Sequence, residues 1–555
     1  MPETITIYCK NNKMYKDVPI GSSLLDIYPM VNSPLHYRPM NAQVNNKVQG
    51  LNYRCWGPKD IEYVDYTQLS GMRAYVRSLC HIFSKAVNDI LPTAIVRLEH
   101  PVSKGYYCVI KNGKELDEQT IAKVKARMQN IIDADFPFHL KTIQTENAAA
   151  LFHERGMEDK VKLIKSVGMP YTSYYDLDGY VNYFYGCLTP STGYISLFDL
   201  IPYFDGVLLR VPKRTDPEEL EPVIKQDKMF EAYKRHLTLQ RTVGLNNVGD
   251  LNRAIEQGLA SQIILVSEAM QEKQVAKIAE DISHRYADGV RIVLISGPSS
   301  SGKTTFCKRL QIQLVTNLIH PVGLSLDDYF LNREDTPKDE NGEYDFESLY
   351  ALDLPYFNND LQKLLAGEEI SVPSFDFGQG RRVFKGKKLQ MKDDSILVIE
   401  GIHGLNPKLT SMIDEKYKYR IYVSVLTTIA LDNHNWIPTT DNRLLRRIIR
   451  DYRFRGYSAC ETIARWPSVR RGEDKWIFPY QENADAMFNS AMLYELAAMR
   501  KYAEPILAQV RENEPENAEA YRLLRFLRYF NYLSDDSLPK ASLLREFLGG
   551  GVFEY

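Results

Sequence analysis

The sequence Arg291-Ile-Val-Leu-Ile-Ser-Gly-Pro-Ser-Ser-Ser-Gly-Lys-Thr304 decides the fold of the region around it. Residues 291–296 form an apolar run with the length of a buried strand. The next eight residues match the pattern GxxxxGK(S/T) at every fixed position. Beyond them, apolar side chains recur at every fourth position, as on the buried face of a helix, at Phe306, Leu310, Leu314 and Leu318. The segment predicts a strand, a phosphate-binding loop and a helix in succession.

The chemistry of this loop explains why it binds phosphate. Glycines allow backbone N–H groups to converge on phosphate oxygens, and the helix N-terminus adds partial positive charge. We expect Lys303 to bridge the β- and γ-phosphates of ATP and the Thr304 hydroxyl to bind Mg²⁺. The residues assigned to ATP are Gly297, Pro298, Ser299, Ser300, Ser301, Gly302, Lys303, Thr304 and Thr305. The sequence therefore predicts an ATP-dependent phosphotransferase.

Two further apolar strands end in acidic residues. One is Val322-Gly-Leu-Ser-Leu-Asp327-Asp328, and the other is Ser395-Ile-Leu-Val-Ile-Glu400. Open α/β sheets bind their ligands at the carboxyl ends of the strands. A kinase built on such a loop needs a carboxylate at the metal and a base for the acceptor hydroxyl. Asp327 and Glu400 are the candidates for these two roles.

Five short motifs follow one another along residues 288–485. They are Gly297–Thr304, Ser325-Leu-Asp-Asp-Tyr-Phe330, Val372-Pro-Ser-Phe-Asp-Phe377, Ile399-Glu-Gly-Ile402 and Asp441-Asn-Arg-Leu-Leu-Arg-Arg447. In these motifs and their order, this region resembles the uridine kinase/phosphoribulokinase family. The resemblance implies that Asp327 is the catalytic base or hydroxyl orienter, close to the metal. It also implies that Glu400 works with Thr304 at the Mg²⁺ site.

The arginines of the last motif share one helix face, because Arg443, Arg446, Arg447 and Arg450 stand at i, i+3, i+4 and i+7. A kinase lid needs such a face to neutralise charge on the transferring phosphoryl group. We expect Arg446 to be catalytic and the other three to contact substrate. The alternative is a solvated face paired with Asp441 and Asp451.

The acceptor side departs from the family pattern. Uridine kinases carry a histidine that helps to read the base where this sequence has Gly380, and a tyrosine where it has Phe375. We expect Phe330 and Phe375 to contact the acceptor, and Glu347, or alternatively Asp345, to bind sugar hydroxyls. The basic run at 381–388 either holds an anionic substrate or is a solvated hairpin edge. The resemblance thus implies phosphotransfer with altered acceptor recognition.

The N-terminal part resembles threonyl-tRNA synthetases. Residues 1–65, with the alternating strand Thr4–Tyr8, resemble the β-grasp TGS module. Residues 66–240, with the helix Val76–Leu91, resemble the second module, where misacylated tRNA is edited. That module carries His-x-x-x-His and Cys-x-x-x-His, whereas this sequence has Arg77 with His81 and Cys187 with Ser191. Arginine has no lone pair to offer a cation, so we expect a retained scaffold without a metal.

The predicted fold is a multidomain α/β chain. Its parts are a TGS-like β-grasp domain (1–65), an α+β synthetase-editing-like domain (66–240), a helical linker (241–287), a P-loop kinase domain with a parallel sheet (288–485) and a C-terminal helical extension of unassigned function (486–555). The 555 residues carry a net charge of -2, which gives no general attraction to nucleic acid or anionic membranes. Seven scattered cysteines predict reduced thiols and a cytoplasmic location, and we expect no membrane partner.

The functional prediction is a kinase that uses ATP and Mg²⁺ to phosphorylate a uridine- or cytidine-like nucleoside. One alternative is a kinase of another sugar or small alcohol. Another, of a different class, is an RNA- or ribosome-associated ATPase whose N-terminal half binds a tRNA-like partner. RNA binding by that half and oligomerisation are both left open by the sequence.

Overall fold

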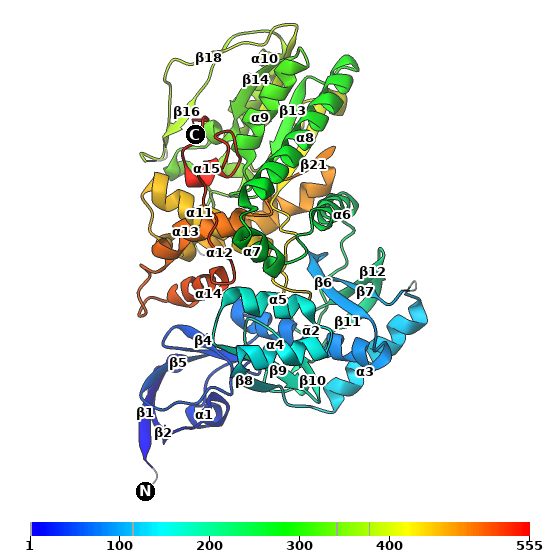
Figure 1. The fold of residues 1–555 in the computed structure, drawn as a ribbon. Coiled ribbons are helices and arrows are strands. Elements are labelled where there is room, and N and C mark those ends of the chain that lie inside the picture. The colour runs from blue at the N-terminus through cyan, green and yellow to red at the C-terminus, as the bar shows by residue number, and fades with distance from the viewer. Residues whose placement is uncertain (1–2, 114–115, 340–341, 377, 555) are drawn as a thin grey trace.

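The computed structural model describes residues 3–113, 116–339, 342–376 and 378–554, so Phe377 of the third kinase motif lies outside the described residues. The N-terminal and C-terminal halves of the chain lie one above the other, and helix α14 (Asn517–Leu527) lies near their junction (Figure 1). The strand, helix and sheet predicted around the phosphate-binding loop are all present, and the C-terminal half is built around that parallel sheet.

The first sheet belongs to the segment expected to be TGS-like. Its strand order is β2-β1-β5-β3-β4, and β1 runs parallel to β5 while the other neighbours are antiparallel. A capping box between Ser23 and Asp26 begins the accompanying helix. The elements are β1 Thr4–Cys9, β2 Met14–Pro19, α1 Leu24–Val31, β3 Asn41–Val44, β4 Lys47–Gln49 and β5 Lys59–Val64.

The next segment has two antiparallel sheets and a long central helix, α2 (Leu69–Ile90), whose side chains are buried along most of its length. The sheets have the orders β11-β12-β7-β6 and β10-β9-β8. The elements are β6 Ile95–Val102, β7 Gly105–Lys111, α3 Glu118–Asp133, β8 His139–Gln144, α4 Thr145–Glu154, α5 Glu158–Val167, β9 Tyr171–Leu177, β10 Tyr180–Asn182, η1 Thr192–Tyr194, β11 Asp199–Tyr203 and β12 Gly206–Arg210.

The linker is helical, as predicted. It contains α7 (Val248–Glu256) and α8 (Ala260–Ala287), and α6 (Asp227–Thr242) precedes it. Although α6 falls within the segment assigned to the editing-like domain, it packs against the C-terminal half, where Tyr233 joins Leu405 and Tyr422 in one apolar cluster. The boundary between the two halves is therefore bridged by a helix.

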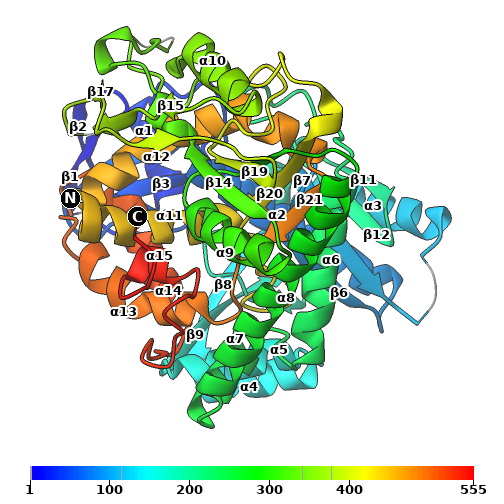
Figure 2. The same ribbon diagram turned by 90° about the horizontal axis from the view of Figure 1, so that it is seen from above.

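The kinase half is built on a five-stranded parallel sheet in the order β14-β19-β13-β20-β21. Helices cover both faces, which explains why the strands are apolar throughout. Helices α8 and α9 lie on one side of the sheet and α10 on the other (Figure 2). Residues 293 and 295 of β13 share a core with α8 and α9, while residues 292 and 294 share a core with α10. The elements are β13 Ile292–Ser296, α9 Lys303–Thr316, β14 His320–Ser325, α10 Leu354–Leu365, β19 Ser395–Glu400, β20 Lys418–Ser424, α11 Thr439–Arg450, α12 Ala459–Trp476 and β21 Ala486–Asn489.

Short elements complete the kinase half. Two hairpins pair β15 with β18 and β16 with β17. The bounds are η2 Leu326–Tyr329, η3 Arg333–Asp335, η4 Leu349–Ala351, β15 Ile370–Ser371, β16 Ser374–Asp376, β17 Arg381–Val383, β18 Lys388–Leu389, η5 Glu415–Tyr417, the π-helical turn η6 Asp451–Arg455 and η7 Phe478–Asn483. The basic run at 381–388 lies on these hairpins, where Arg382 pairs with Asp353 and Lys388 with Glu369.

Two expectations about this half need correction. Leu318 is not on the buried helix face, because α9 ends at Thr316 and Leu318 has φ 62° and is 93% exposed. The four-residue apolar spacing continues beyond the end of the helix, into the turn that leads to β14. The sheet also extends past residue 485, since its edge strand β21 covers Ala486–Asn489.

The C-terminal extension is helical, as predicted. It contains α13 (Glu495–Leu507), α14 and the short α15 (Arg545–Leu548). Helix α14 connects the two halves of the molecule: Glu519 pairs with Arg73 at 2.9 Å, and Arg522 pairs with Asp441 of α11 at 2.7 Å.

The cysteines agree with the prediction of reduced thiols. All seven cysteines, which lie within the described ranges, are free thiols. Among the described residues, no helix combines the length and apolar character needed to cross a bilayer.

Candidate active site at the phosphate-binding loop

The loop between β13 and α9 needs glycine for steric reasons at two positions. A Cβ on Gly297 would lie 2.1 Å from the carbonyl oxygen of Val423, and Gly302 has φ +84°. Within the described residues, the backbone amides of Ser300 and Gly302 donate to no protein acceptor. These amides are available to phosphate oxygens, as the motif predicts.

Lys303 is half-buried at the start of α9. Its ammonium donates one hydrogen bond, to the carbonyl oxygen of Pro298 at 3.2 Å. Enclosure by protein lowers the pKa of Lys303, while the nearby carboxylates of Glu400 and Asp327 act in the opposite direction. A lysine with a single neutral partner and acidic neighbours can turn toward phosphate with little loss of protein contacts.

The two predicted acids lie at the same edge of the sheet. Ser325 of β14 is in register with Glu400 of β19, and Asp327 follows in the turn η2. Glu400 accepts a hydrogen bond from the Thr304 hydroxyl at 3.4 Å. The set of Thr304, Glu400 and Asp327 offers the oxygen ligands that Mg²⁺ prefers.

Both carboxyl groups have raised pKa values. Restricted hydration raises the pKa of Glu400, and the Asp327 carboxylate raises it further. The same restricted hydration raises the pKa of Asp327, although that side chain still reaches solvent, and the Lys303 ammonium opposes the shift. A nearby cation stabilises the ionised form of such carboxyl groups, so this arrangement favours a bound divalent ion.

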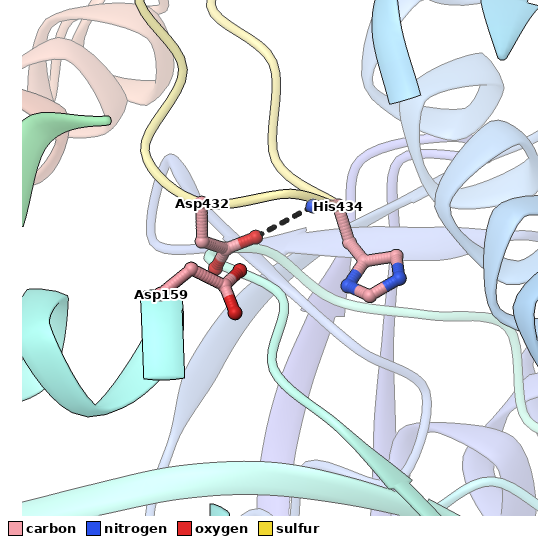
Figure 3. Close-up of side chains that lie close together, drawn as sticks. All are labelled: Asp159, Asp432 and His434. Atoms are coloured by element: carbon pink, nitrogen blue, oxygen red, sulfur yellow. Dashed lines mark hydrogen bonds between the residues drawn. The ribbon is translucent and has the colours of Figure 1, made fainter. Parts of the chain in front are cut away.

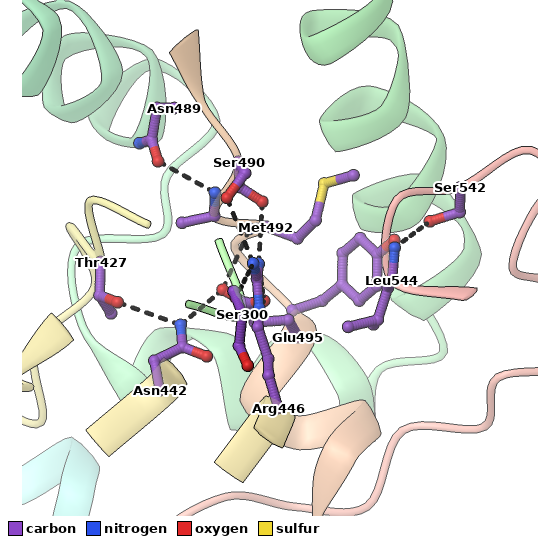
Figure 4. Close-up of polar contacts among 12 residues, drawn as sticks. Ser300, Thr427, Asn442, Arg446, Asn489, Ser490, Met492, Glu495, Ser542 and Leu544 are labelled. Atoms are coloured by element: carbon purple, nitrogen blue, oxygen red, sulfur yellow. Dashed lines mark hydrogen bonds and ion pairs between the residues drawn. The ribbon is translucent and has the colours of Figure 1, made fainter. Parts of the chain in front are cut away.

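The arginine face of α11 is less open than expected. Arg443 and Arg446 are 1% and 0% exposed. Arg443 donates to Glu473 of α12 and to the carbonyl oxygen of Ser299. Arg446 donates to Glu495 and to the carbonyl oxygen of Ser490, as Figure 4 shows. These two arginines lie inside the protein behind the loop, unlike a lid that closes from solvent.

The other two arginines of the face contact the loop itself. Arg447 donates to the Ser299 hydroxyl at 2.8 Å, and Arg450 donates to the Ser300 hydroxyl at 3.2 Å. Both also pair with Asp451, which the alternative of a solvated face predicted. The other acid of that alternative, Asp441, pairs instead with Arg522 of α14. The face therefore combines internal pairing with contact to the phosphate-binding loop.

The predicted acceptor residues border this site. The rings of Phe330 and Phe375 are 5.7 Å apart at their centroids. Glu347 has a buried carboxylate oxygen without a hydrogen-bond partner. Burial, and then the Glu473 carboxylate, raise the pKa of Glu347 to about 7, while Arg447 and Lys303 oppose the shift. The charges of Lys303 and Asp327 both act on the pKa of Glu347, which places Glu347 near these residues.

The position that departs from the uridine kinase pattern has a local explanation. Gly380 has φ +67°, and a Cβ there would lie 2.8 Å from Nε of Arg333. The backbone N–H of Arg333 donates to the Gly380 carbonyl oxygen at 2.8 Å. A histidine at this position would be strained and would collide with Arg333.

The comparisons with known proteins agree with this geometry. Residues 292–496 match the family described as Phosphoribulokinase / Uridine kinase. A uridine kinase from Staphylococcus aureus (strain JH9) is 30% identical over 197 residues, which cover 35% of this chain and 84% of that enzyme. The C-terminal half of the chain belongs to the phosphoribulokinase/uridine kinase family. It is also similar to a uridine kinase from Schizosaccharomyces pombe, with 32% identity over 196 residues that cover 35% of this chain and 37% of that one.

The N-terminal half has different relatives. A threonine–tRNA ligase from Syntrophomonas wolfei is 27% identical over 241 residues, which cover 41% of this chain. The match spans only 38% of the length of that ligase. A solved structure described as a possible uridine kinase from Bacillus stearothermophilus covers 39% of this chain and 98% of its own, at 17% identity and a TM-score of 0.25.

One of the residues expected to remain from an editing site, Cys187, contacts an arginine. Arg77 donates to the carbonyl oxygen of Cys187 at 3.4 Å. His81 is buried, with Phe138 and Phe184 on either side, and burial lowers its pKa to about 3. Arg77, which offers no lone pair to a cation, therefore lies beside Cys187, one of the two remaining positions.

A second acidic group lies between the two halves. Asp159 of α5 lies close to Asp432 and His434, which belong to a loop of the kinase half (Figure 3). Asp159 accepts from the Asn433 amide at 2.8 Å, and the buried Lys160 ammonium lies 3.0 Å from Asp432. Because Lys160 already supplies a cation there, we interpret the group as a polar clamp that joins the halves.

Three residues at the kinase site were not identified from the sequence. Glu473 accepts from Arg443 and from the Ser299 amide of the loop, and His403 is buried with a pKa lowered to about 4 by burial. Glu546, near the C-terminus, accepts from Thr305. Only His403 stands near a recognised motif, three residues after Glu400; neither glutamate has a local signal.

Proposed function

We propose that the protein is an ATP- and Mg²⁺-dependent kinase that phosphorylates a hydroxyl of a uridine- or cytidine-like nucleoside. The observation that supports this most is the convergence of Lys303, Asp327 and Glu400 at one edge of a parallel sheet, beside a loop with free amides. Family membership supports phosphotransfer, and the two uridine kinase relatives support a nucleoside acceptor.

The reaction follows from these positions. The acceptor oxygen forms a bond to the γ-phosphorus, the bond from that phosphorus to the β–γ bridging oxygen breaks, and the hydroxyl proton passes to Asp327. Lys303 stabilises negative charge on the transferring group. Thr304 and Glu400 would hold Mg²⁺, which neutralises phosphate charge when bound.

The arginines divide into two roles in this proposal. Arg447 and Arg450, which reach the loop serines, would contact phosphate or substrate. Arg443 and Arg446 hold the loop through the carbonyl oxygens of Ser299 and Ser300. Because the donors of Arg446 are engaged by Glu495 and Ser490, we assign it a positioning role in place of the predicted catalytic one.

Glu347 gives the acceptor site a pH dependence. An ionised carboxylate accepts hydrogen bonds from sugar hydroxyls better than the protonated form. The raised pKa of about 7 means that the group is mostly protonated below this pH and ionised above it. We expect the acceptor KM to fall roughly tenfold between about pH 6 and about pH 8, as the ionised fraction rises. The acceptor KM of Glu347→Gln should vary little over the same range, and parallel profiles for the two proteins would refute this role.

The acceptor pocket should discriminate the sugar more than the base. Gly380 and Phe375 have no polar side-chain group to leave unpaired when the base is changed, so the usual penalty for a wrong base is small. Ribonucleosides should react better than 2′-deoxy forms, and uridine and cytidine should differ by less than about tenfold in kcat/KM. The test is kcat/KM across uridine, cytidine, their deoxy forms, purine nucleosides and free sugars. A sharp uridine preference would show that another residue, such as Arg333, reads the base.

A second candidate has support from the N-terminal half. Its similarity to part of a threonine–tRNA ligase favours an RNA-associated ATPase, in which the loop serves as a switch. Such a protein would hydrolyse ATP faster when RNA is added and no small acceptor is present. The carboxylates at the sheet edge and the buried Glu347 favour the kinase, because a switch has no need of an acceptor site.

A further inference from the structure

The C-terminal segment, residues 538–554, returns to the phosphate-binding loop. Figure 2 places α15 beside α11, and the Phe547 ring lies 5.1 Å from the Arg446 guanidinium. Leu543 packs on Gly302, where a Cβ would approach Leu543 Cδ2 to 2.5 Å. Five apolar side chains of the segment are at most 3% exposed: Leu538, Leu543, Leu544, Phe547 and Leu548. The segment is thus an integral part of the kinase core.

This packing brings one carboxylate onto the loop. Glu546 is 6% exposed, and its Oε2 accepts from the Thr305 amide at 3.2 Å and from the Thr305 hydroxyl at 2.7 Å. Its Oε1 lies 3.7 Å from Nη1 of Arg450. The charge of Glu546 also acts on the pKa values of Lys303 and Glu400, and raises both. Glu546 is therefore an acidic group within the site itself.

The Thr305 amide is one that a bound nucleotide would use. In loops of this kind, backbone N–H groups of the loop and of the first helical turn hold the α- and β-phosphates. Thr305 comes directly after the fixed GKT residues, on the first turn of α9. Ser300 and Gly302, earlier in the loop, have no protein acceptor for their amides in the described residues. One end of the phosphate cradle is open, and the other holds a carboxylate.

We propose that Glu546 occupies the α-phosphate subsite and thereby sets the affinity of the protein for nucleoside di- and triphosphates. This inference rests on the proposed function, because it assumes that the loop binds ATP. Two anions cannot share the Thr305 amide, so the Glu546 side chain must turn away when a nucleotide binds. Inorganic diphosphate has no α-phosphate group. Because it is shorter, it can occupy the open end of the cradle without reaching Thr305. Glu546 therefore weakens the binding of nucleotides more than the binding of diphosphate.

The contact also has a purely structural interpretation. Gly302, the N-cap of α9, has no side chain to cap the helix, and Glu546 supplies an acceptor for the first turn. In that case the loss of Glu546 would lower thermal stability and leave nucleotide affinity unchanged. Nucleotide affinity therefore separates the two interpretations, with melting temperature measured beside it.

The test is equilibrium binding of MgADP, a non-hydrolysable MgATP analogue and Mg-diphosphate to the full chain, without acceptor. Glu546→Gln retains an oxygen for the Thr305 contacts and removes the charge, and Glu546→Ala removes both. We expect both variants to bind the two nucleotides at least about tenfold more tightly, with diphosphate changed less than about threefold. Asp536→Asn, which removes an exposed charge from the adjoining Ser534–Asp536 turn, should behave as wild type.

Unchanged or weaker nucleotide binding in both Glu546 variants would overturn the proposal. So would an equal gain for diphosphate and nucleotide, because a general charge effect would then explain the result. Tighter nucleotide binding without nucleoside phosphorylation would support the role of Glu546 and contradict only the proposed acceptor.

Discussion

We expect replacement of Lys303 by alanine to lower kcat/KM for phosphotransfer by about 1,000-fold and to leave the fold intact. The ammonium is the group that would neutralise charge on the transferring phosphoryl group, and loss of one such preorganised donor typically has an effect of this order. The fold should survive because the side chain makes one hydrogen bond to protein, to Pro298, and lies half-buried at a loop–helix junction.

The measurement for Lys303→Ala is steady-state turnover of ATP with acceptor, together with a thermal melt. Lys308→Ala is the matched control, because it removes the same charge five residues further along α9. Retention of activity within about tenfold of wild type, roughly 1.4 kcal/mol, would refute the phosphate-binding role of this loop.

Substitution of Asp327 by asparagine should lower kcat by about 100-fold or more, with little change in KM for ATP. A proton acceptor acts mainly in the transition state, and its loss therefore affects the chemical step more than binding. Asparagine keeps the size of the side chain and removes its basicity. The raised pKa of Asp327 also fits this role, since a more basic carboxylate is a better proton acceptor at neutral pH.

Asp328→Asn is the comparison for this prediction, because Asp328 is the next residue in the same turn. Its activity should stay within a few-fold of wild type. If Asp328→Asn lost activity and Asp327→Asn kept it, the assignment of the base at this strand end would be displaced by one residue. Loss of ATP affinity in Asp327→Asn would instead indicate a role confined to the metal.

The parts of the site that the sequence predicted are those in which a local pattern implies the geometry. The strand before Gly297, the helix after Thr304 and the apolar strand before Glu400 each place a side chain at the carboxyl edge of a parallel sheet, whatever the rest of the chain does. The register of Ser325 with Glu400 agrees with that expectation. Local sequence patterns are therefore sufficient to assign the acidic strand ends and the loop to one site.

The burial of Arg443 and Arg446 could not be predicted in the same way. Helical spacing shows that the arginines share a face, but it does not show what the face contacts. Their partners, Glu473 and Glu495, lie 30 and 49 residues further along the chain, in segments without a recognisable motif. A pair of this kind is defined by tertiary packing, and a solvated face and an internal face have the same local sequence.

Glu546 illustrates the same limit over a longer separation. It meets Thr305 from 241 residues away, through a segment whose sequence shows no recognisable motif. Leu318 shows the reverse error, in which a local pattern continues beyond the element that produced it. Its four-residue spacing fits α9, but the helix ends two residues earlier and the side chain is exposed.

The most direct test of the central claim follows the γ-phosphoryl group of labelled ATP. The full chain is incubated with Mg²⁺, labelled ATP and either uridine, cytidine or RNA, and the labelled products are separated. We predict label on the nucleoside as a monophosphate, with Lys303→Ala inactive and no stimulation by RNA. Label released only as inorganic phosphate, at a rate that RNA increases and nucleosides leave unchanged, would contradict the nucleoside kinase and favour the RNA-associated ATPase.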